Sequence, residues 1–220
     1  MMNLEGKPVI VAGGGRVALR KINSLLAAGA KVVVISPQVG PELEDLASRG
    51  PVTWIPEPFR DELLDRYPDA VLVFGTTDNR EVNTAIHTAA VKRKIPCNIA
   101  DVPDLCTFIV PAVITQGDLM IAVSTGGSSP ALARRIREDL ETRYGPEYAA
   151  MTQLLGDLRK RILETGNTSD ENKKVFLDLV DSEILTALRQ KDREKALAIL
   201  RAILPHEVDA ENAIDESRLI

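Results

Sequence analysis

Three consecutive glycines, Gly13, Gly14 and Gly15, are the first residues whose spacing suggests chemistry. With Ala18 they complete the pattern G-x-G-x-x-(G/A), between a short apolar run and a stretch with helical periodicity. This is the context that a dinucleotide-binding fingerprint requires. Glycine permits the tight turn and the close approach of a pyrophosphate to the helix N-terminus. The pattern therefore predicts a nucleotide site, with a purely structural strand–helix turn as the alternative.

The residues that would bind the ribose of such a nucleotide are unusual. Dinucleotide folds place Asp or Glu at the end of the second strand. This chain has Ser36, Pro37 and Gln38 there, without an acidic residue and without an arginine for a 2′-phosphate. Ser36, Gln38 or backbone amides would have to hold the ribose, and the motif itself leaves NAD and NADP undecided.

Two further segments carry side chains suited to chemistry. Asp101 follows a short strand-like run, and open α/β sheets bind ligands at the carboxyl ends of their strands. Residues 124–130, Ser-Thr-Gly-Gly-Ser-Ser-Pro, are followed by Arg134, Arg135 and Arg137. Hydroxyl groups, free amides and guanidinium groups suit the recognition of a carboxylate. The alternatives are a loop or cap role for Asp101 and an ordinary capped helix with exposed arginines.

Composition and motifs argue against several other classes of function. A net charge of −5 and 4% aromatic residues disfavour nucleic-acid binding, and the apolar runs are too short to span a membrane. His87 and His206 are far apart, and the two cysteines, Cys97 and Cys106, do not form C-x-x-C. We therefore expect no metal site and no disulfide scaffold. The start lacks a signal-peptide pattern, so we expect a cytoplasmic protein.

Alternating elements must position these residues. Between residues 8 and 99, β-branched runs alternate with amphipathic stretches, which predicts a parallel, doubly wound α/β sheet of Rossmann type. A capping box of Asp78 and Glu81 is expected to open the last of its helices. The predicted strands are residues 8–12, 31–35, 52–55, 70–74 and 97–99, and the predicted helices are residues 17–28, 40–48, 61–66 and 78–92.

The pattern changes after residue 106. Residues 107–115 and 118–124 resemble two strands joined by a turn, which predicts an antiparallel hairpin. Ser129 and Pro130 then begin a long helix, because serine caps helices and proline is favoured at their first position. Helices are expected nearly to Pro205, with breaks near residues 145–146 and 165–169, and the acidic tail beyond is expected to be frayed.

Together these segments resemble the precorrin-2 dehydrogenase/sirohydrochlorin ferrochelatase module of sirohaem synthases. The Ser36-Pro37 end of the second strand, odd for a generic dehydrogenase, is similar to what this family has there. The family's methyltransferase domain is missing, so the chain is expected to be a stand-alone version. The matching residues run in the family's order and are 11–21, 75–78 with Asn83, 97–101, 108–112 and 124–134.

The resemblance implies a homodimer built from three parts. These are an NAD-binding Rossmann domain (residues 1–112), a strand–helix dimerisation segment (113–145) and a helical domain with the frayed acidic tail (146–220). It also implies that NAD oxidises precorrin-2 to sirohydrochlorin, and that bifunctional members then insert ferrous iron. Iron would be a substrate, because the macrocycle itself supplies the metal ligands.

The resemblance also assigns roles to residues. The family's candidate catalytic carboxylate corresponds to Asp101, which would accept a proton. Arg20, Lys21, Arg134 and Arg135 are candidate counter-charges for the substrate's carboxylates. The implied cofactor contacts are Gly13, Gly14, Gly15, Arg16, Val17, Ser36, Pro37, Gln38 and Thr76. The implied substrate contacts are Ser124, Thr125, Gly126, Ser128 and Arg134.

Two rival functions stay open at this point. One is another NAD(P)-dependent oxidoreductase with a different small-molecule substrate. The other is a nucleotide-sensing Rossmann protein, which would bind NAD without turnover and would need neither Asp101 nor Thr125. The sequence leaves open whether iron insertion is retained.

Overall fold

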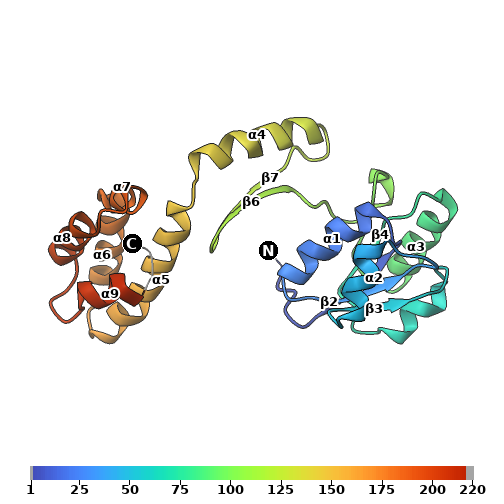
Figure 1. Cartoon of the computed structure of the whole chain (residues 1–220), viewed down its shortest axis with the longest axis horizontal. Coiled ribbons are helices and arrows are strands. Elements are labelled where there is room, and N and C mark those ends of the chain that lie inside the picture. Colours follow the sequence, from blue (N-terminus) through green and yellow to red (C-terminus); the bar gives the residue numbers. More distant parts are fainter. Residues whose placement is uncertain (1, 217–220) are drawn as a thin grey trace. The chain divides into compact units, whose positions relative to one another are not determined.

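Buried strands rich in Val and Ile form the parallel sheet of the first unit, Met1–Val110 (Figure 1). The strand order is β3-β2-β1-β4-β5, with every neighbouring pair parallel. This is the order of a doubly wound sheet, so the predicted fold class is confirmed. The computed structural model describes residues 2–216. The strands are β1 (Pro8–Ala12), β2 (Lys31–Ile35), β3 (Val52–Ile55), β4 (Leu72–Gly75) and β5 (Cys97–Ile99).

Helices pack on both faces of this sheet. On one face, α1 buries Ile22 and α2 buries Leu43 against the odd-numbered residues of β1. On the other face, the 3₁₀-helix η1 buries Leu64 and α3 buries Ile86 against its even-numbered residues. Alternate residues of a strand point to opposite faces, so one strand serves both cores. The helices are α1 (Arg16–Ala27), α2 (Pro41–Ser48), η1 (Asp61–Arg66) and α3 (Arg80–Lys92).

The cap of α3 differs from the one that the sequence predicts. Asn79, and not Asp78, is the N-cap residue, because its side chain accepts hydrogen bonds from the backbone N–H groups of Glu81 (2.9 Å) and Val82 (3.1 Å). Either Asp or Asn can fill this role, and here the backbone of Asn79 takes the extended conformation that a cap requires. The cap therefore lies one residue later than expected, and the helix begins at Arg80.

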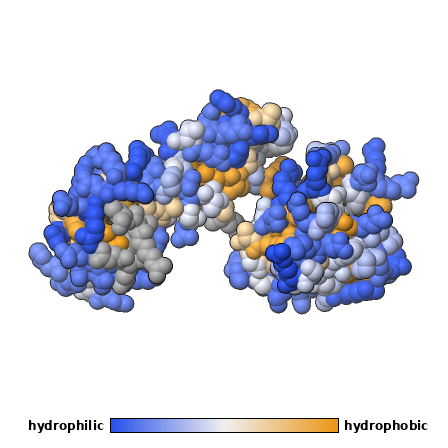
Figure 2. Space-filling view, in the orientation of Figure 1, coloured by the Kyte–Doolittle hydropathy of each residue, from blue (hydrophilic) through white to orange (hydrophobic). Residues whose placement is uncertain are grey.

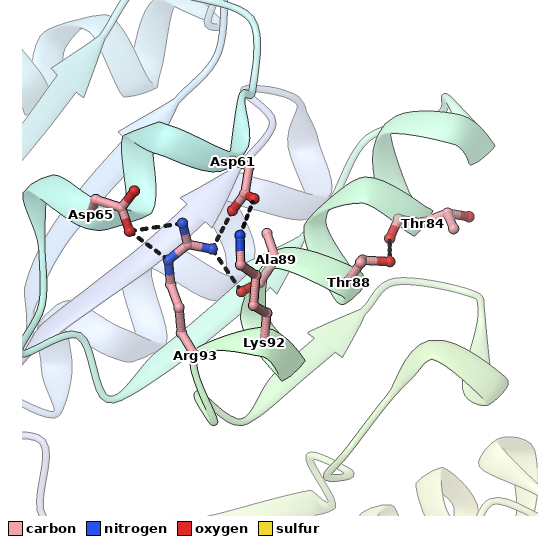
Figure 3. A network of polar contacts seen from close by, with 7 residues as sticks. All are labelled: Asp61, Asp65, Thr84, Thr88, Ala89, Lys92 and Arg93. Atoms are coloured by element: carbon pink, nitrogen blue, oxygen red, sulfur yellow. Dashed lines mark hydrogen bonds and ion pairs between the residues drawn. The ribbon is translucent and has the colours of Figure 1, made fainter.

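A network of charges fixes η1 to the end of α3 (Figure 3). The Arg93 guanidinium, only 17% exposed, forms ion pairs with Asp61 and Asp65 and donates to the carbonyl of Ala89 at 3.0 Å. Lys92 adds a 3.3 Å contact to Asp61. Hydrogen bonding from Arg93 is the main cause that holds the pKa of Asp61 below its ordinary value.

The second unit, Pro111–Ile220, begins with an antiparallel hairpin of β6 (Ala112–Gln116) and β7 (Leu119–Val123). The turn is Gly117-Asp118, and Gly117 has a φ of +56°, as hairpin turns of this length require. The first strand begins at Ala112 and not at Thr107 as predicted. Residues 107–108 bond to β5 of the first unit instead, and Pro111 has no N–H to donate.

Helices make up the rest of the second unit. The breaks near residues 145 and 167 are present, but Ser182-Glu183 and Lys191-Asp192 add two that the sequence analysis missed. Lys191 takes a left-handed conformation, with a φ of +56°, to end its helix. The helices are α4 (Pro130–Arg143), α5 (Glu147–Glu164), α6 (Ser169–Asp181), α7 (Ile184–Gln190), α8 (Arg193–Ile203) and α9 (Ala210–Glu216).

The frayed acidic tail is a wrong expectation for residues 210–216. They form α9, where Ala213 and Ile214 are buried in the helical core, so apolar packing offsets the local charge. The remainder of the expected tail, residues 217–220, lies outside the described residues. Within residues 2–216, none of the helices combines the length and the apolar character that crossing a membrane demands.

Candidate functional site

The glycines that follow β1 serve two different purposes. Gly13 has a φ of +117°, and a Cβ there would lie 2.5 Å from the Thr76 hydroxyl oxygen. A Cβ on Gly14 would overlap the backbone oxygen of Gln38. The fold itself therefore requires both glycines. A Cβ on Gly15, by contrast, would meet no protein atom within 4 Å, so this position is open toward solvent or a ligand.

Gly15 is also the N-cap of α1, and it leaves the helix N-terminus uncapped. Among the described residues 2–216 there is no side-chain cap hydrogen bond at the N-terminus of α1, and the first turn contains no acidic residue. Its first residue, Arg16, is exposed. An uncapped N-terminus with free N–H groups beside a guanidinium is a site for an anion such as a phosphate.

A cleft of ≈ 840 Å³ lies at this end of the sheet, over the carboxyl ends of the strands. All nine predicted cofactor residues line it: Gly13, Gly14, Gly15, Arg16, Val17, Ser36, Pro37, Gln38 and Thr76. Sequence reasoning missed the remaining lining residues that follow β3 and β4. Only their place after a predicted strand could have indicated these residues, because the loops that follow parallel strands lie at one edge of the sheet. They are Pro58, Phe59, Thr77, Asp78, Asn79 and Val82.

Ser36 shapes the wall of the cleft after β2. It is only 7% exposed, and its hydroxyl donates to the Gln38 carbonyl at 2.6 Å. The indole N–H of Trp54 donates to the Ser36 carbonyl at 2.9 Å. The hydroxyl proton is thus engaged within the protein, which leaves the exposed Pro37 and Gln38 to face a ligand.

The loop after β4 is held just as firmly on the opposite wall. The Thr76 hydroxyl donates to the Ala12 carbonyl at 2.9 Å. Asn83, 4% exposed, donates from Nδ2 to the Thr77 carbonyl at 3.0 Å and accepts at Oδ1 from the Thr77 hydroxyl at 2.8 Å. Rigid walls of this kind favour binding, because little conformational freedom is lost when the ligand enters.

Asp101 lies beyond the end of β5 and is not among the residues that line this cleft. Its carboxylate is exposed, and its backbone has a φ of +60°, a conformation that few residues other than glycine adopt. The chain before it continues the sheet, because the Ala100 N–H donates to the Gly75 carbonyl at 2.8 Å. Strained residues of this kind cluster at functional sites.

Several bonds close the loop that carries Asp101. The Cys106 thiol accepts from the Ile99 N–H at 3.2 Å and lies 3.4 Å from the Val102 carbonyl. The Thr107 N–H donates to the Cys97 carbonyl at 2.8 Å, and its hydroxyl accepts from the Cys97 N–H at the same distance. The loop over residues 99–106 is therefore tied at both ends.

His87 and Cys97 make contacts that support the fold. Nδ1 of His87 lies 2.9 Å from the Leu105 carbonyl and 3.5 Å from the Cys97 sulfur. Burial raises the pKa of the Cys97 thiol, which disfavours the reactive thiolate. No group of three or more His, Cys, Asp or Glu side chains within residues 2–216 is placed to hold a metal ion.

The second candidate site is the turn over residues 124–129, which we name the hydroxyl turn. Thr125 donates its hydroxyl to the Ser129 carbonyl and accepts from the Ser129 N–H, both at 3.0 Å. Ser124 accepts from the Gly126 N–H at 3.2 Å, and Ser129 accepts from the Leu132 N–H at 3.2 Å. The expectation of free amides is therefore wrong for these N–H groups, which the turn's own side chains satisfy.

The arginines that follow the hydroxyl turn are paired, in contrast to the free counter-charges that the sequence suggests. Arg134 donates to Glu138 at 2.9 Å, and Arg135 lies 3.3 Å from Asp139, one helical turn on. Arg137 pairs with Glu138 and Glu141. Such exposed i,i+4 pairs contribute little, so a stronger anion could exchange with the carboxylates.

Two models of known families match separate parts of the chain. Residues 1–112 match a family model described as putative NAD(P)-binding. Residues 116–143 match a model described as sirohaem biosynthesis protein central. Both matches fall on the elements that carry the two candidate sites.

Similar proteins are known in bacteria. A siroheme synthase of Methylobacillus flagellatus is 34% identical over 203 residues, which cover 90% of this chain and 43% of that protein. Siroheme synthase 3 of Aeromonas hydrophila is 36% identical over 194 residues, 88% of this chain and 41% of that protein. The chain thus spans less than half the length of these relatives. A solved structure titled "SirC, precorrin-2 dehydrogenase" has a TM-score of 0.76 and 26% identity, over 92% of this chain and 96% of that one.

Proposed function

We propose that this chain, which belongs to the putative NAD(P)-binding family, oxidises precorrin-2 to sirohydrochlorin with NAD. One observation carries the proposal: the cleft at the carboxyl edge of the sheet has an uncapped helix N-terminus beside an open glycine. The similarity to a precorrin-2 dehydrogenase over 92% of the chain supplies the substrate class.

The residues of the cleft fit a dinucleotide. Gly15 and Arg16 would hold the pyrophosphate, because their position offers free N–H groups and a positive charge without a side chain in the way. Pro37 and Gln38 would contact the adenosine ribose, and Thr76 would border the opposite wall. The bound nicotinamide supplies a hydride acceptor.

Asp101 would accept the proton that dehydrogenation releases. Precorrin-2 loses two hydrogens, one as a hydride and one as a proton, so a base must take the proton. The Asp101 carboxylate follows β5, which pairs with β4, and the end of β4 borders the cleft. Hydrogen bonds tie the loop that carries Asp101 at both ends. We place the general base here and not at His87, whose Nδ1 lies against the carbonyl of Leu105.

The hydroxyl turn and Arg134 would bind carboxylates of the tetrapyrrole. The exposed hydroxyls of Ser124 and Ser128 offer donors, and Arg134 can exchange Glu138 for a substrate carboxylate. Ferrous iron would be a second substrate, because the macrocycle supplies its ligands. The cytoplasm stays the predicted location.

A homodimer is also part of the proposal. Apolar side chains are exposed on the hairpin and on α4, with Met120 at 48%, Leu132 at 52% and Ile136 at 37%. Figure 2 shows hydrophobic surface (orange) where the hairpin lies and hydrophilic surface (blue) along the outer side of α4. A two-stranded sheet with exposed apolar residues and two free edges favours pairing with a second copy. A mass near 24.0 kDa in light scattering at micromolar concentration would contradict the dimer.

The direct test is turnover. Purified protein is incubated with precorrin-2 and either NAD or NADP, and NADH or NADPH formation is followed together with the spectrum of sirohydrochlorin. We expect reduced cofactor and sirohydrochlorin in equal amounts. A parallel series with ferrous iron follows the appearance of sirohaem. Cofactor binding without any turnover would instead favour a nucleotide sensor.

A substitution of Asp101 separates catalysis from binding. Asp101→Asn keeps the shape but removes the basicity, so turnover should fall by roughly 10²- to 10⁴-fold, the usual range for a general base. The affinity for NAD, measured by calorimetry, should stay near that of the wild type. Full activity of this variant would make Asp101 a structural residue of its loop.

A further inference from the structure

Lys21 has an environment that its place on a surface helix does not explain. It is half-buried in the second turn of α1, and its Nζ donates to Oδ1 of Asn98 at 3.1 Å. The same ammonium lies 4.9 Å from the centre of the Phe74 ring, in a cation–π contact. None of the described carboxylates forms an ion pair with Lys21. A partly desolvated charge without a counter-ion costs stability, so its position calls for a compensating role.

The two partners of Lys21 belong to the strands that lead to the candidate site. Phe74 and Asn98 are register partners on β4 and β5. Asn98 also donates from Nδ2 to the Phe108 carbonyl at 3.1 Å, and the Phe108 ring packs edge-on against Phe74 at 5.6 Å. Asn98 stands immediately before the loop over residues 99–106, and Phe108 follows that loop two residues after Cys106. One ammonium therefore joins α1 to both ends of the loop that carries Asp101.

Charge links Lys21 to this loop as well. Burial is the main cause that lowers the pKa of Lys21, and the neighbouring Arg20 lowers it further. Cys106 and the Asp101 carboxylate act in the opposite direction. Asp101 is thus within electrostatic reach of the ammonium, although the two do not form an ion pair.

We propose that Lys21 is a positioning residue for the dehydrogenation: through Asn98 and Phe74 it fixes the Asp101 loop relative to the helix that holds the cofactor. This rests on the proposed function. The N-terminus of α1 carries Gly15, so the Lys21–Asn98 bond sets the distance between the cofactor's anchor and the catalytic carboxylate. A shift of about 1 Å between reacting groups can lower a rate about 100-fold, so such a bond has consequences for turnover.

A double-mutant cycle tests this proposal. Lys21→Met and Asn98→Ala each remove one end of the bond, and we expect each to lower kcat by roughly 10- to 100-fold. NAD affinity should change less than about twofold, because neither residue lines the cleft. The double variant should be no slower than the worse single variant, because both act through one bond. Lys21→Arg, which keeps a cation able to reach Asn98, should restore part of the rate.

A further readout distinguishes positioning from a general loss of fold. Hydrogen exchange over residues 99–108 should speed up in Lys21→Met, whether or not turnover is measurable. The matched control is Lys31→Met, an exposed lysine at the start of β2, far along its strand from the carboxyl edge, which should behave as the wild type.

The outcomes separate the two proposals. If the wild type does not oxidise precorrin-2, the proposed function fails, and exchange over residues 99–108 still decides whether Lys21 holds the loop. If Asp101→Asn is inactive while Lys21→Met keeps full kcat and unchanged exchange, the role of Lys21 is wrong. Strictly additive effects in the cycle would also overturn it, since Lys21 and Asn98 would then act separately.

Discussion

Two glycine-containing turns precede helix N-termini in this chain, and they differ in whether a side chain caps the helix. Before α1, Gly15 caps the helix without any side-chain hydrogen bond. Before α4, Ser129 caps the helix with its own hydroxyl, and Thr125 bonds both backbone groups of Ser129. The first turn therefore keeps its N–H groups for a ligand, whereas the second satisfies them internally. A helix N-terminus is an anion site only where its own sequence does not occupy it.

The glycines of the two turns differ in the same sense. Gly13 and Gly14 are required by close contacts with the neighbouring loops after β4 and β2. Gly126 and Gly127 are required by backbone conformation, with φ values of +62° and +89°, and a Cβ at Gly126 would meet no protein atom within 4 Å. Close packing thus requires glycine in the first turn, at Gly13 together with its φ of +117°, whereas backbone conformation alone requires Gly126 in the second turn.

The largest expected effect follows from the open position in the first turn. Gly15→Asp places a carboxylate where the pyrophosphate would lie, so NAD affinity in calorimetry should fall at least about 100-fold, as like charges repel in a low-dielectric site. The melting temperature should change little, because no protein atom lies within 4 Å of a Cβ there. Gly13→Ala is the contrasting variant and should destabilise the fold. Unchanged NAD affinity in Gly15→Asp would remove the glycine loop from the cofactor site.

A smaller effect is expected in the hydroxyl turn. Thr125→Ala removes two hydrogen bonds with the Ser129 backbone, which hold the hydroxyl turn in the shape that, on the proposed function, binds the substrate. The KM for precorrin-2 should rise about fivefold, the equivalent of about 1 kcal/mol for a neutral hydrogen bond, while NAD affinity stays constant. Thr125→Ser keeps the hydroxyl and should stay close to the wild type. A fall in NAD affinity would show that the two turns are not independent.

The difference between the turns also marks how far the sequence could lead. The parallel strands and the glycine loop were predictable, because buried Val–Ile runs and G-x-G-x-x-A carry their structure locally. The pairing of Arg134 with Glu138 was also predictable, because i,i+4 spacing on a helix brings opposite charges together. The link between Lys21 and Asn98 was not predictable, because the two are 77 residues apart and only the folded chain brings the Lys21 side chain to β5.

The next effect concerns the charge beside the hydroxyl turn. Arg134→Gln removes a guanidinium that is 77% exposed, so the KM for precorrin-2 should rise about two- to threefold at low salt and stay unchanged at high salt. Arg143→Gln, at the other end of α4, is the matched control. An effect that persists in high salt would mean that the substrate buries Arg134 in a specific pair.

The smallest expected effect is on the free energy of unfolding. It compares Asp61 in the first unit with Glu138 in the second. Hydrogen bonding from Arg93 lowers the pKa of Asp61, and hydrogen bonding from Arg134 lowers that of Glu138. A lowered pKa contributes stability above the ordinary pKa, and that contribution is lost as the pH falls through the folded-state value. Arg93 is 17% exposed, whereas Arg134 is 77% exposed, so only the first pair is partly shielded from water.

Asp61→Asn should therefore lower the free energy of unfolding at pH 7 by about 1 kcal/mol or less, because the Asp61 side chain itself is 41% exposed. Urea unfolding followed by the fluorescence of Trp54, the single tryptophan, reports on the first unit. The difference from the wild type should shrink as the pH falls below 3.8, the ordinary value of the aspartate pKa, because protonation then removes the same charge. Glu138→Gln, followed by circular dichroism, should show no change at either pH. A difference for Asp61→Asn that persists in acid would mean that the substitution destabilises the fold for a reason other than the lost Asp61 charge.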